Sequence, residues 1–227
     1  MVDIGLLNEK QLHAALKHWY AQPGDCLEVA VGGFVIDIIQ EGVFVEIQTG
    51  NFSSIKRKIK TLTKEHVLRL VYPIAHEKWI VKQIEDAPTV RRKSPKRGQV
   101  IEVCQELVSF PELLACPNFS LEVLLIREEE IRRYDGNKGW RRRGWVTEER
   151  KLLEVVESHI FQDSTDLQAL IPAGLPEPFT TTDLARELQI PRRLSQQAAY
   201  CLRKAGVVET IGKRGRSNLY ARVGRIK

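Results

Sequence analysis

Hydrophobic positions in the first part of the chain recur at helical spacing and then at extended spacing. Leu12, Leu16 and Trp19 fall on one helical face, whereas the runs around Val35 and Val45 are rich in β-branched residues. In chain order, the pattern predicts a helix over 8–20, strands over 26–31, 34–39 and 43–48, a helix over 53–64 and a strand over 67–74. Helices and strands in this order are typical of a sheet covered by helices, so we expect a mixed α/β (α+β) fold.

A tight turn is predicted between the second and third of these strands. The dipeptide Glu41-Gly42 separates two β-branched runs, and glycine in the second turn position permits a two-residue hairpin. With that turn, Asp37 lies directly opposite Glu46, and the alternation of side chains places Gln48 on the same face of the sheet. The hairpin is therefore expected to bring two carboxylates together.

Two carboxylates in this arrangement need a compensating charge. Their β-carbons are expected about 4.5–5.5 Å apart in a mostly apolar sheet, where the acids repel unless a cation or a shared proton intervenes. A hard divalent cation meets this need, can bind a phosphodiester oxygen and lowers the pKa of a bound water. Asp37 and Glu46 are therefore candidate ligands of Mg²⁺ or Mn²⁺. The alternative is an exposed hairpin face on which both acids are solvated.

The C-terminal part of the chain carries a second pattern. Thr181 or Thr182 can cap a helix, and Pro191 ends that helix but suits the first turn of the next one, which Gly206 stops. Two β-prone runs then surround a cationic tip. The predicted elements are a helix over 183–188, a helix over 191–205, and hairpin strands over 207–211 and 218–222.

Composition narrows the class of protein. Of the 227 residues, 43% are hydrophobic and 28% are charged, which suffices to bury a core. The chain has no apolar run long enough to span a membrane and no signal-peptide pattern, so we expect a cytoplasmic protein without a membrane partner. The four cysteines form no zinc-binding pair, and Walker, GxGxxG and GxSxG motifs are absent. These absences argue against a zinc site, nucleotide hydrolysis and serine hydrolase chemistry.

Charge is distributed in blocks. Residues 1–50 hold 7 acidic and 2 basic residues, residues 51–84 hold 8 basic and 2 acidic, and residues 179–227 hold 11 basic and 3 acidic. An acidic region beside two basic ones suits a protein that binds a polyanion together with a cation, because phosphates attract Lys and Arg while divalent ions attract carboxylates. The alternative is a solvated surface with accidental clustering.

Asp37, Glu46 and the order of elements around them resemble the PD-(D/E)xK nuclease superfamily over about residues 6–84. The resemblance implies a restriction-endonuclease-like core and metal-dependent cleavage of DNA. Asp37 matches the family's metal-binding aspartate, Glu46 the first acid of its tripeptide, and Ile47 the middle residue, whose carbonyl is often a ligand. Gln48 occupies the lysine position and departs from the pattern, because a neutral amide cannot supply a cationic partner to the attacking hydroxide.

Family members sometimes supply the missing lysine from the following helix, where this chain has two candidates. Lys58 lies about 65° from the centre of the apolar stripe of that helix and Lys56 about 90°, so Lys58 is the first candidate and Lys56 the second. The superfamily often adds a carboxylate from the first helix, and Glu9 sits near the stripe there. An acid in a first turn also simply complements the helix dipole, so both roles stay open for Glu9.

The C-terminal elements resemble a winged-helix DNA-binding domain over about 147–223, if residues 147–159 supply its first helix. In that family the second helix of the helix-turn-helix enters the major groove and the hairpin touches the backbone or the minor groove. The alternative is a winged helix used for protein contact. The resemblance implies DNA contacts by Arg192, Arg193, Gln196 and Gln197 in the helix and by Lys213, Arg214 and Arg216 in the hairpin.

Together these patterns predict a nuclease-like core over 1–84, a basic connecting region over 85–146 and a winged helix over 147–227. The favoured function is a Mg²⁺- or Mn²⁺-dependent DNA endonuclease, which would commonly be a homodimer if it cuts both strands. A DNA-binding regulator whose nuclease-like fold has lost activity is the main alternative, and the missing lysine of the tripeptide favours it. An assembly protein that uses the winged helix for protein contacts is a third.

Overall fold

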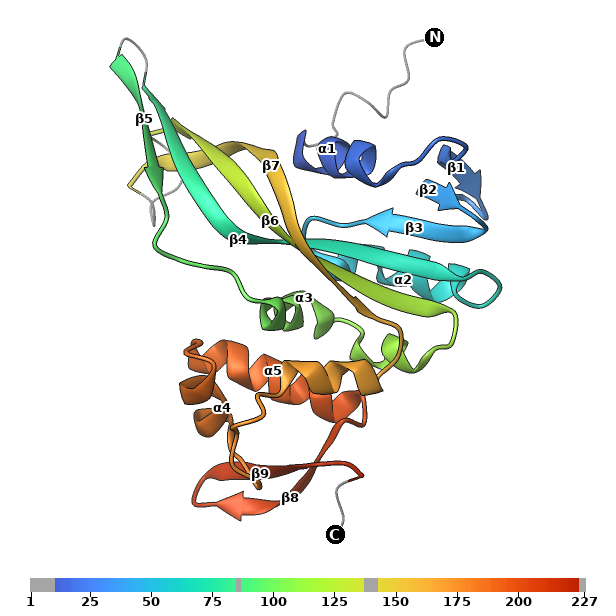
Figure 1. Ribbon diagram of the computed structural model, residues 1–227, viewed down its shortest axis with the longest axis vertical. Helices are drawn as coiled ribbons and strands as arrows, with labels where there is room; N and C mark the ends of the chain where they lie inside the picture. The colour runs from blue at the N-terminus through green and yellow to red at the C-terminus, as the bar shows by residue number, and fades with distance from the viewer. Residues whose placement is uncertain (1–10, 85–86, 137–142, 225–227) are drawn as a thin grey trace.

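The structure is a computed structural model that describes residues 11–84, 87–136 and 143–224 (Figure 1). Its elements are, in chain order, α1 (Gln11–Tyr20), β1 (Cys26–Val31), β2 (Phe34–Gln40), β3 (Val43–Ile47), α2 (Phe52–Leu62), β4 (Leu68–Ile84), β5 (Ala87–Lys93), the 3-10 helix η2 (Val100–Val103), α3 (Cys104–Leu107), η3 (Pro111–Ala115), β6 (Phe119–Tyr134), β7 (Trp145–Phe161), η5 (Thr165–Leu170), α4 (Thr181–Glu187), α5 (Arg192–Lys204), β8 (Val208–Arg214) and β9 (Ser217–Arg222).

A mixed sheet forms the body of the molecule. Its strand order is β1-β2-β3-β4-β6-β7, and β5 pairs with the outer part of β4. The β1–β2, β2–β3 and β6–β7 pairs are antiparallel, whereas β3–β4 and β4–β6 are parallel. Figure 1 shows α1 on one side of this sheet and α2 and α3 on the other. The expected mixed sheet flanked by helices is therefore confirmed.

Alternating side chains of the strands build two separate cores. In β3, Val45 packs in a cluster with Leu12 and Leu16 of α1, whereas its neighbour Phe44 packs in a cluster with Ile59 of α2. Successive residues of a strand point to opposite faces, so the two clusters lie on the two sides of the sheet. Residues of β2 and β3 are thus within reach of both α1 and α2.

Most predicted elements of the N-terminal part are found close to their expected positions. The three strands predicted over 26–31, 34–39 and 43–48 correspond to β1, β2 and β3, and the helix predicted over 53–64 corresponds to α2. The strand predicted over 67–74 is much longer, since β4 continues to Ile84 along β5 and β6. None of the helices in the described ranges is long and apolar enough to cross a membrane.

The helix predicted over 147–159 is wrong, because these residues lie in β7. Strand β7 pairs with β6 from Trp145 opposite Tyr134 to Phe161 opposite Leu121. Its apolar residues come in adjacent couples, such as Leu152-Leu153, which fit a helical as well as an extended spacing; the long partner strand β6 decides between them. The predicted division between 146 and 147 therefore falls inside a strand of the main sheet.

Beyond the sheet, the predicted helices and hairpin of the C-terminal part are found as α4, α5, β8 and β9. Helix α4 starts two residues earlier than expected, at Thr181. Its N-cap is Thr180, in a reciprocal capping box with Asp183, and not Thr181 or Thr182 as predicted. Helix α5 ends just before Gly206, whose φ of 75° is the left-handed geometry of a helix C-terminus.

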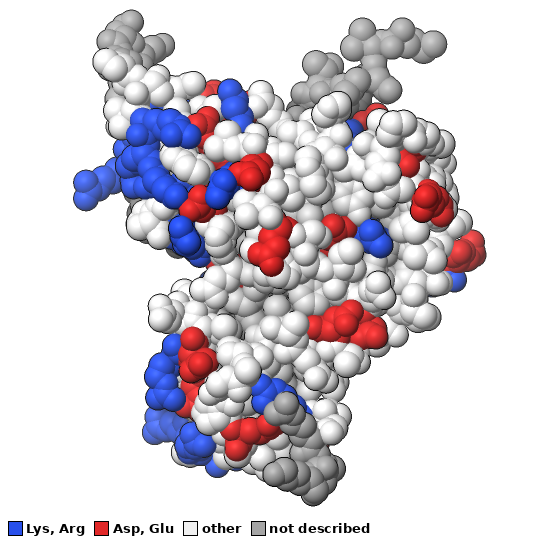
Figure 2. All heavy atoms as spheres, in the orientation of Figure 1, with Lys and Arg blue, Asp and Glu red and all other residues white. Residues whose placement is uncertain are grey.

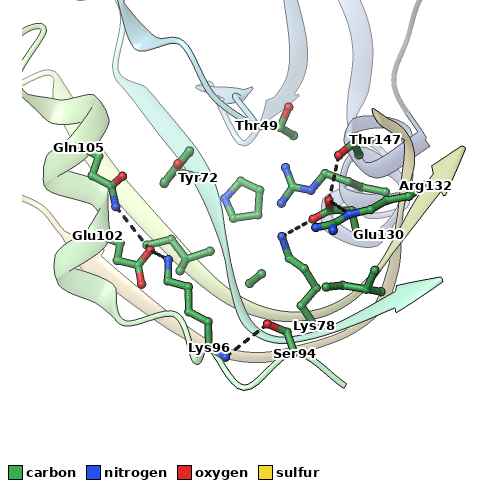
Figure 3. Close-up of a pocket in the computed structure, with 15 residues that line it drawn as sticks. Thr49, Tyr72, Lys78, Ser94, Lys96, Glu102, Gln105, Glu130, Arg132 and Thr147 are labelled. Atoms are coloured by element: carbon green, nitrogen blue, oxygen red, sulfur yellow. Dashed lines mark hydrogen bonds and ion pairs between the residues drawn. The ribbon is translucent and has the colours of Figure 1, made fainter. Parts of the chain in front are cut away.

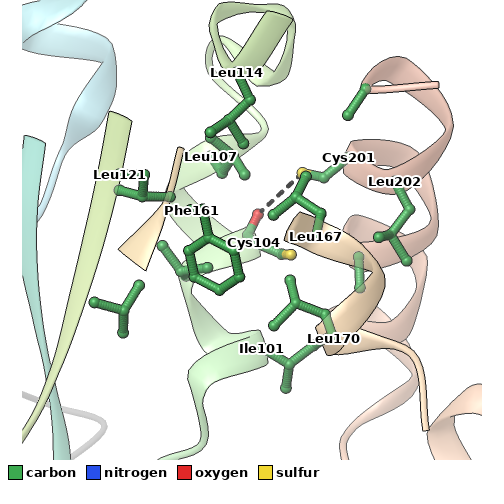
Figure 4. Packing of buried hydrophobic residues seen from close by; sticks show 14 of the residues in the cluster. Ile101, Cys104, Leu107, Leu114, Leu121, Phe161, Leu167, Leu170, Cys201 and Leu202 are labelled. Atoms are coloured by element: carbon green, nitrogen blue, oxygen red, sulfur yellow. Dashed lines mark hydrogen bonds between the residues drawn. The ribbon is translucent and has the colours of Figure 1, made fainter. Parts of the chain in front are cut away.

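The C-terminal elements share their hydrophobic core with the sheet. A single cluster joins Leu121 of β6 and Phe161 of β7 to Leu202 of α5. Figure 4 shows Cys201 of α5 facing Cys104 of α3, and the Cys201 thiol donates to the Cys104 carbonyl at 3.8 Å. These elements are therefore packed onto the sheet through buried side chains.

A shared core predicts that the sheet and the C-terminal elements unfold together. Phe161 is 3% exposed. We expect Phe161→Ala to lower the free energy of unfolding by about 3–5 kcal/mol in one cooperative transition. Urea denaturation followed by circular dichroism measures this. The control Leu153→Ala, at a side chain that is 47% exposed, should change stability far less. Two transitions, with only one of them shifted, would contradict a shared core.

Candidate active site

The turn between β2 and β3 sets the register of the candidate site. Glu41 and Gly42 have φ of 50° and 82°, the paired left-handed geometry of a two-residue hairpin turn. Pairing runs from Gln40 opposite Val43 to Ile38 opposite Val45. The predicted turn and the pairing of these three residues are confirmed. The ladder ends at Ile38 opposite Val45, so the expected pairing of Asp37 directly opposite Glu46 stays a prediction.

The Asp37 carboxylate contacts helix α1 and the neighbouring strand β3. Its Oδ2 atom accepts the Ile47 N–H at 2.7 Å and lies 3.2 Å from Nε2 of His13 in α1. Burial alone would raise the pKa of Asp37, but the hydrogen bond and positive charge of His13, together with the Ile47 N–H, hold this pKa below its usual range. Asp37 is therefore a carboxylate at neutral pH.

Glu46 lies deeper and is held from the opposite side. The residue is 5% exposed, and its Oε2 atom lies 2.5 Å from the Lys58 ammonium of α2, which also donates to the Val35 carbonyl. Burial and the negative charge of Asp37 raise the pKa of Glu46 to about 7, against the opposing effect of Lys58. Apart from the ion pair, the described residues supply no hydrogen bond to this buried oxygen.

The two acids thus titrate differently although they are neighbours. Asp37 is ionised, while Glu46 exchanges its proton near neutral pH. Carboxyl pairs whose pKa values are driven apart by their surroundings are characteristic of acid–base and metal-assisted chemistry. Neither acid is solvated on an open hairpin face, which was the alternative from the sequence.

The other predicted residues divide between the site and its surroundings. Lys58 reaches Glu46, whereas the Lys56 ammonium donates to the Ser109 carbonyl at 2.7 Å and lies outside the site. The Gln48 side-chain amide donates a hydrogen bond to the Gly50 carbonyl in the loop before α2, so this amide stabilises that loop. Ile47 contributes its N–H to Asp37. Glu9 lies outside the described residues.

Sequence reasoning assigned no chemistry to His13. Its partner Asp37 is 24 positions away, and no HxH or HExxH unit marks it. The signal in the sequence that could have identified His13 is its position next to Leu12. Leu12 is buried against the sheet, so the side chain of the next residue lies at the edge of the same helix face. Only the packing of α1 onto β3 brings the imidazole to the carboxylate.

The oxygen atoms of this site suit a hard divalent ion. Within the described ranges, no three His, Cys, Asp or Glu side chains form a group that could hold a metal ion. Asp37 and Glu46 provide two carboxylates, and the buried Oε2 of Glu46 is an acceptor that forms an ion pair with Lys58. Carboxylate and carbonyl oxygens with added water are the usual ligands of Mg²⁺ and Mn²⁺, so the residues present fit such an ion.

The predicted DNA-contacting residues also differ in their surroundings. On α5, Arg192, Arg193 and Gln196 are exposed and Gln197 is half-buried. In the hairpin, Lys213 and Arg216 are exposed, but Arg214 forms an ion pair with Asp183 at 3.3 Å and donates to the Pro178 carbonyl. Arg214 is exposed as well, and it connects the hairpin to α4 through this ion pair. Figure 2 shows basic side chains gathered at the β5 end of the sheet and over α4 and α5, with a hollow between them.

Comparison with known proteins places the chain in a family. Residues 10–162 match the model of a domain of unknown function, DUF8091. The chain belongs to the DUF8091 family. A relative from Treponema pallidum (strain Nichols), named "Uncharacterized protein", is 30% identical over 96% of this chain and 87% of that protein. No solved structure matches the chain significantly. The DUF8091 match ends one residue after β7 and so contains the whole sheet and both carboxylates.

The raised pKa of Glu46 predicts a pH-dependent stability for this DUF8091 protein. A carboxyl that binds its proton more tightly in the folded chain contributes most below its ordinary pKa of 4.5, and that contribution is lost as the pH rises through about 7. Asp37 has a lowered pKa and stays ionised above pH 5, so it adds no pH dependence to the free energy of unfolding in that range. We expect Glu46→Gln to gain stability over wild type by about 2–3 kcal/mol between pH 5 and pH 8.

Urea denaturation in EDTA across this pH range measures the difference. The control Glu112→Gln removes an exposed acid whose pKa is lowered, so it should leave the pH profile unchanged. Parallel profiles for wild type and Glu46→Gln would show that Glu46 does not titrate in this window.

Proposed function

We propose that this protein is a metal-dependent DNA endonuclease that hydrolyses phosphodiester bonds. The observation that carries the proposal is the convergence of Asp37, Glu46 and Lys58 from β2, β3 and α2. These are the two acids and the lysine that a PD-(D/E)xK site requires, although the lysine comes from a different position. The order of the elements α1 to β4 supports a restriction-endonuclease-like core around them.

In this proposal the two acids hold the ion and Lys58 acts on the substrate. Asp37, Glu46 and the Ile47 carbonyl would hold Mg²⁺ or Mn²⁺, with Glu9 as an additional ligand. When bound, such an ion lowers the pKa of a coordinated water and neutralises charge on the scissile phosphate. The Lys58 ammonium would donate to the phosphate or to the attacking hydroxide. His13 would keep Asp37 oriented and ionised.

The C-terminal elements would deliver this core to DNA. The order α4, α5, β8 and β9, with a turn between the helices and a cationic hairpin, supports a winged helix. Arg192 and Gln196 are exposed on α5, and Lys213 and Arg216 are exposed in the hairpin, as phosphate or base contacts require. Cleavage of both strands of a duplex would call for a homodimer, one active site for each strand.

A DNA-binding protein without hydrolytic activity is the second candidate. Two observations favour it: Lys58 and His13 already compensate the two acids within the protein, and Gln48 replaces the lysine of the tripeptide. In this candidate the same residues would form a structural ion cluster, and the basic surfaces would keep their role.

Cleavage assays on DNA with Mg²⁺ and with Mn²⁺ separate the two candidates. We expect wild type to cut duplex, branched or single-stranded DNA, and Glu46→Ala and Asp37→Asn to lose at least about 100-fold in rate. Lys58→Ala should lose about 10²–10³-fold, because it removes a donor to the transition state. The matched control Lys56→Ala removes the same charge from the same helix and should stay within a few-fold of wild type, since its ammonium binds the Ser109 carbonyl.

The opposite result is equally clear. If all three forms of DNA stay intact at high protein concentration while DNA binding persists, the protein is the non-hydrolytic DNA-binding protein.

A further inference from the structure

Three hollows of the surface share walls and form one groove. The first, of about 480 Å³, lies between β4, β6, β7 and α3 (Figure 3). A second, of about 900 Å³, lies between the segment 95–106 and the start of α5, and it shares Lys96, Glu102 and Gln105 with the first. A third, of about 350 Å³, reaches α1 and shares Thr49, Thr147 and Arg150 with the first. The groove therefore runs from α5 across the sheet to α1.

One end of this groove lies beside the candidate active site. Its wall includes Thr49, which follows β3 three positions after Glu46, and Gln11, which begins the helix that carries His13. Asp37 and Glu46 do not line the three hollows. At the other end, Arg193 and Gln197 of α5 form the wall. The groove thus connects two regions that the sequence separates by about 150 residues.

Cations in the middle of the groove are held in place by buried acids. Lys78 lies 3.1 Å from Glu128 and 2.7 Å from Glu130, and Arg150 lies 2.6 Å from Glu128. Glu128 is fully buried and Glu130 is 3% exposed. Figure 3 shows Lys78 and Arg132 side by side at Glu130. An ammonium has three donors and a guanidinium five, so these fixed side chains keep donors for a ligand in the cavity.

Cations at the α5 end are more exposed. The side chains of Lys96 and Arg97 are 70% and 65% exposed, and Arg193 forms no ion pair within the described ranges. The acids in this wall have internal partners: Glu102 pairs with Lys96, and Glu106 accepts the Phe52 N–H at the start of α2 at 3.0 Å. Positive charge therefore prevails at this end of the groove.

We propose that this groove binds the phosphodiester backbone of one DNA strand and leads it from α5 to the candidate active site. The inference rests on the proposed function for the identity of the substrate. Hollows of this size match pockets for small ligands, so they admit one strand and exclude a double helix. A polar groove lined by cations is the surface that tracks a nucleic-acid backbone without reading its sequence.

Neutralising the exposed cations tests the groove and leaves the ion pairs of Lys78 and Arg150 with Glu128 in place. Arg97 also pairs with the buried Glu77, which keeps Lys93 and Arg127 as partners when Arg97 is replaced. The triple variant Lys96→Gln, Arg97→Gln and Arg193→Gln removes three charges. The matched control Lys64→Gln, Arg203→Gln and Lys204→Gln removes three exposed charges outside the groove. Binding of fluorescent single-stranded and duplex oligonucleotides is measured by anisotropy in EDTA, so that no hydrolysis occurs.

We expect the groove variant to bind at least about tenfold more weakly than the control, with the slope of log K against log salt reduced by about 2–3. A loss with single-stranded DNA supports the inference, whereas a loss confined to duplex DNA would overturn it, because the groove is proposed to hold one strand. Unchanged binding of both forms by the groove variant, or an equal loss in the control, would overturn the inference.

Chemical protection gives a second test that needs no variant. DNA should shield Lys96 of the wild-type protein from an amine-modifying reagent and leave Lys64 reactive, and equal reactivity of Lys96 with and without DNA would overturn the inference. These tests are separate from the test of hydrolysis. Binding in the groove without cleavage would contradict the proposed endonuclease alone, and cleavage with unchanged groove binding would contradict the groove alone.

Discussion

The buried Glu46 and the half-buried Asp37 beside it need compensating charge, and the architecture around them supplies it from both faces of the sheet. Lys58 reaches Glu46 from α2, and His13 reaches Asp37 from α1. Removal of one partner from a buried pair typically costs about 3–5 kcal/mol, so the hairpin register and the positions of both helices depend on one another. The same compensation sets the chemistry, because it leaves one acid ionised and lets the other titrate near neutral pH.

Local signals were sufficient for the parts of the site that are close in sequence. Glycine at position 42 permits the turn, and the turn sets the register from Gln40 opposite Val43 to Ile38 opposite Val45. Asp37 and Glu46 follow at the end of this ladder, close enough for the charge of Asp37 to raise the pKa of Glu46. Helical geometry was enough to prefer Lys58 over Lys56, since Lys58 reaches Glu46 whereas Lys56 binds the Ser109 carbonyl. His13 could not be predicted in this way. Its contact with Asp37 exists only because α1 packs across β3, and no sequence spacing encodes that docking.

The main failure, the helix expected over 147–159, has a similar origin. Leu152-Leu153 and Val155-Val156 satisfy both periods, so the local pattern does not choose between helix and strand. The neighbouring strand β6 decides between helix and strand. It is long and rich in buried residues, and β7 pairs along its free edge. Ion pairs across this ladder, such as Arg150 with Glu128, add a second long-range term that favours the strand.

The position of α5 has the greatest consequence for ligand binding. Six of its thirteen residues are buried, and Cys201 and Leu202 belong to the core that also contains Leu121 of the sheet. Separation of α5 from the sheet would expose this apolar surface to water, at about 25 cal/mol for each Å². The exposed start of the helix is therefore held in a fixed position relative to β4 and β6. A ligand that contacts Arg193 and Lys78 together would lose no additional entropy in bringing these two side chains into register, so α5 would form one wall of the proposed groove.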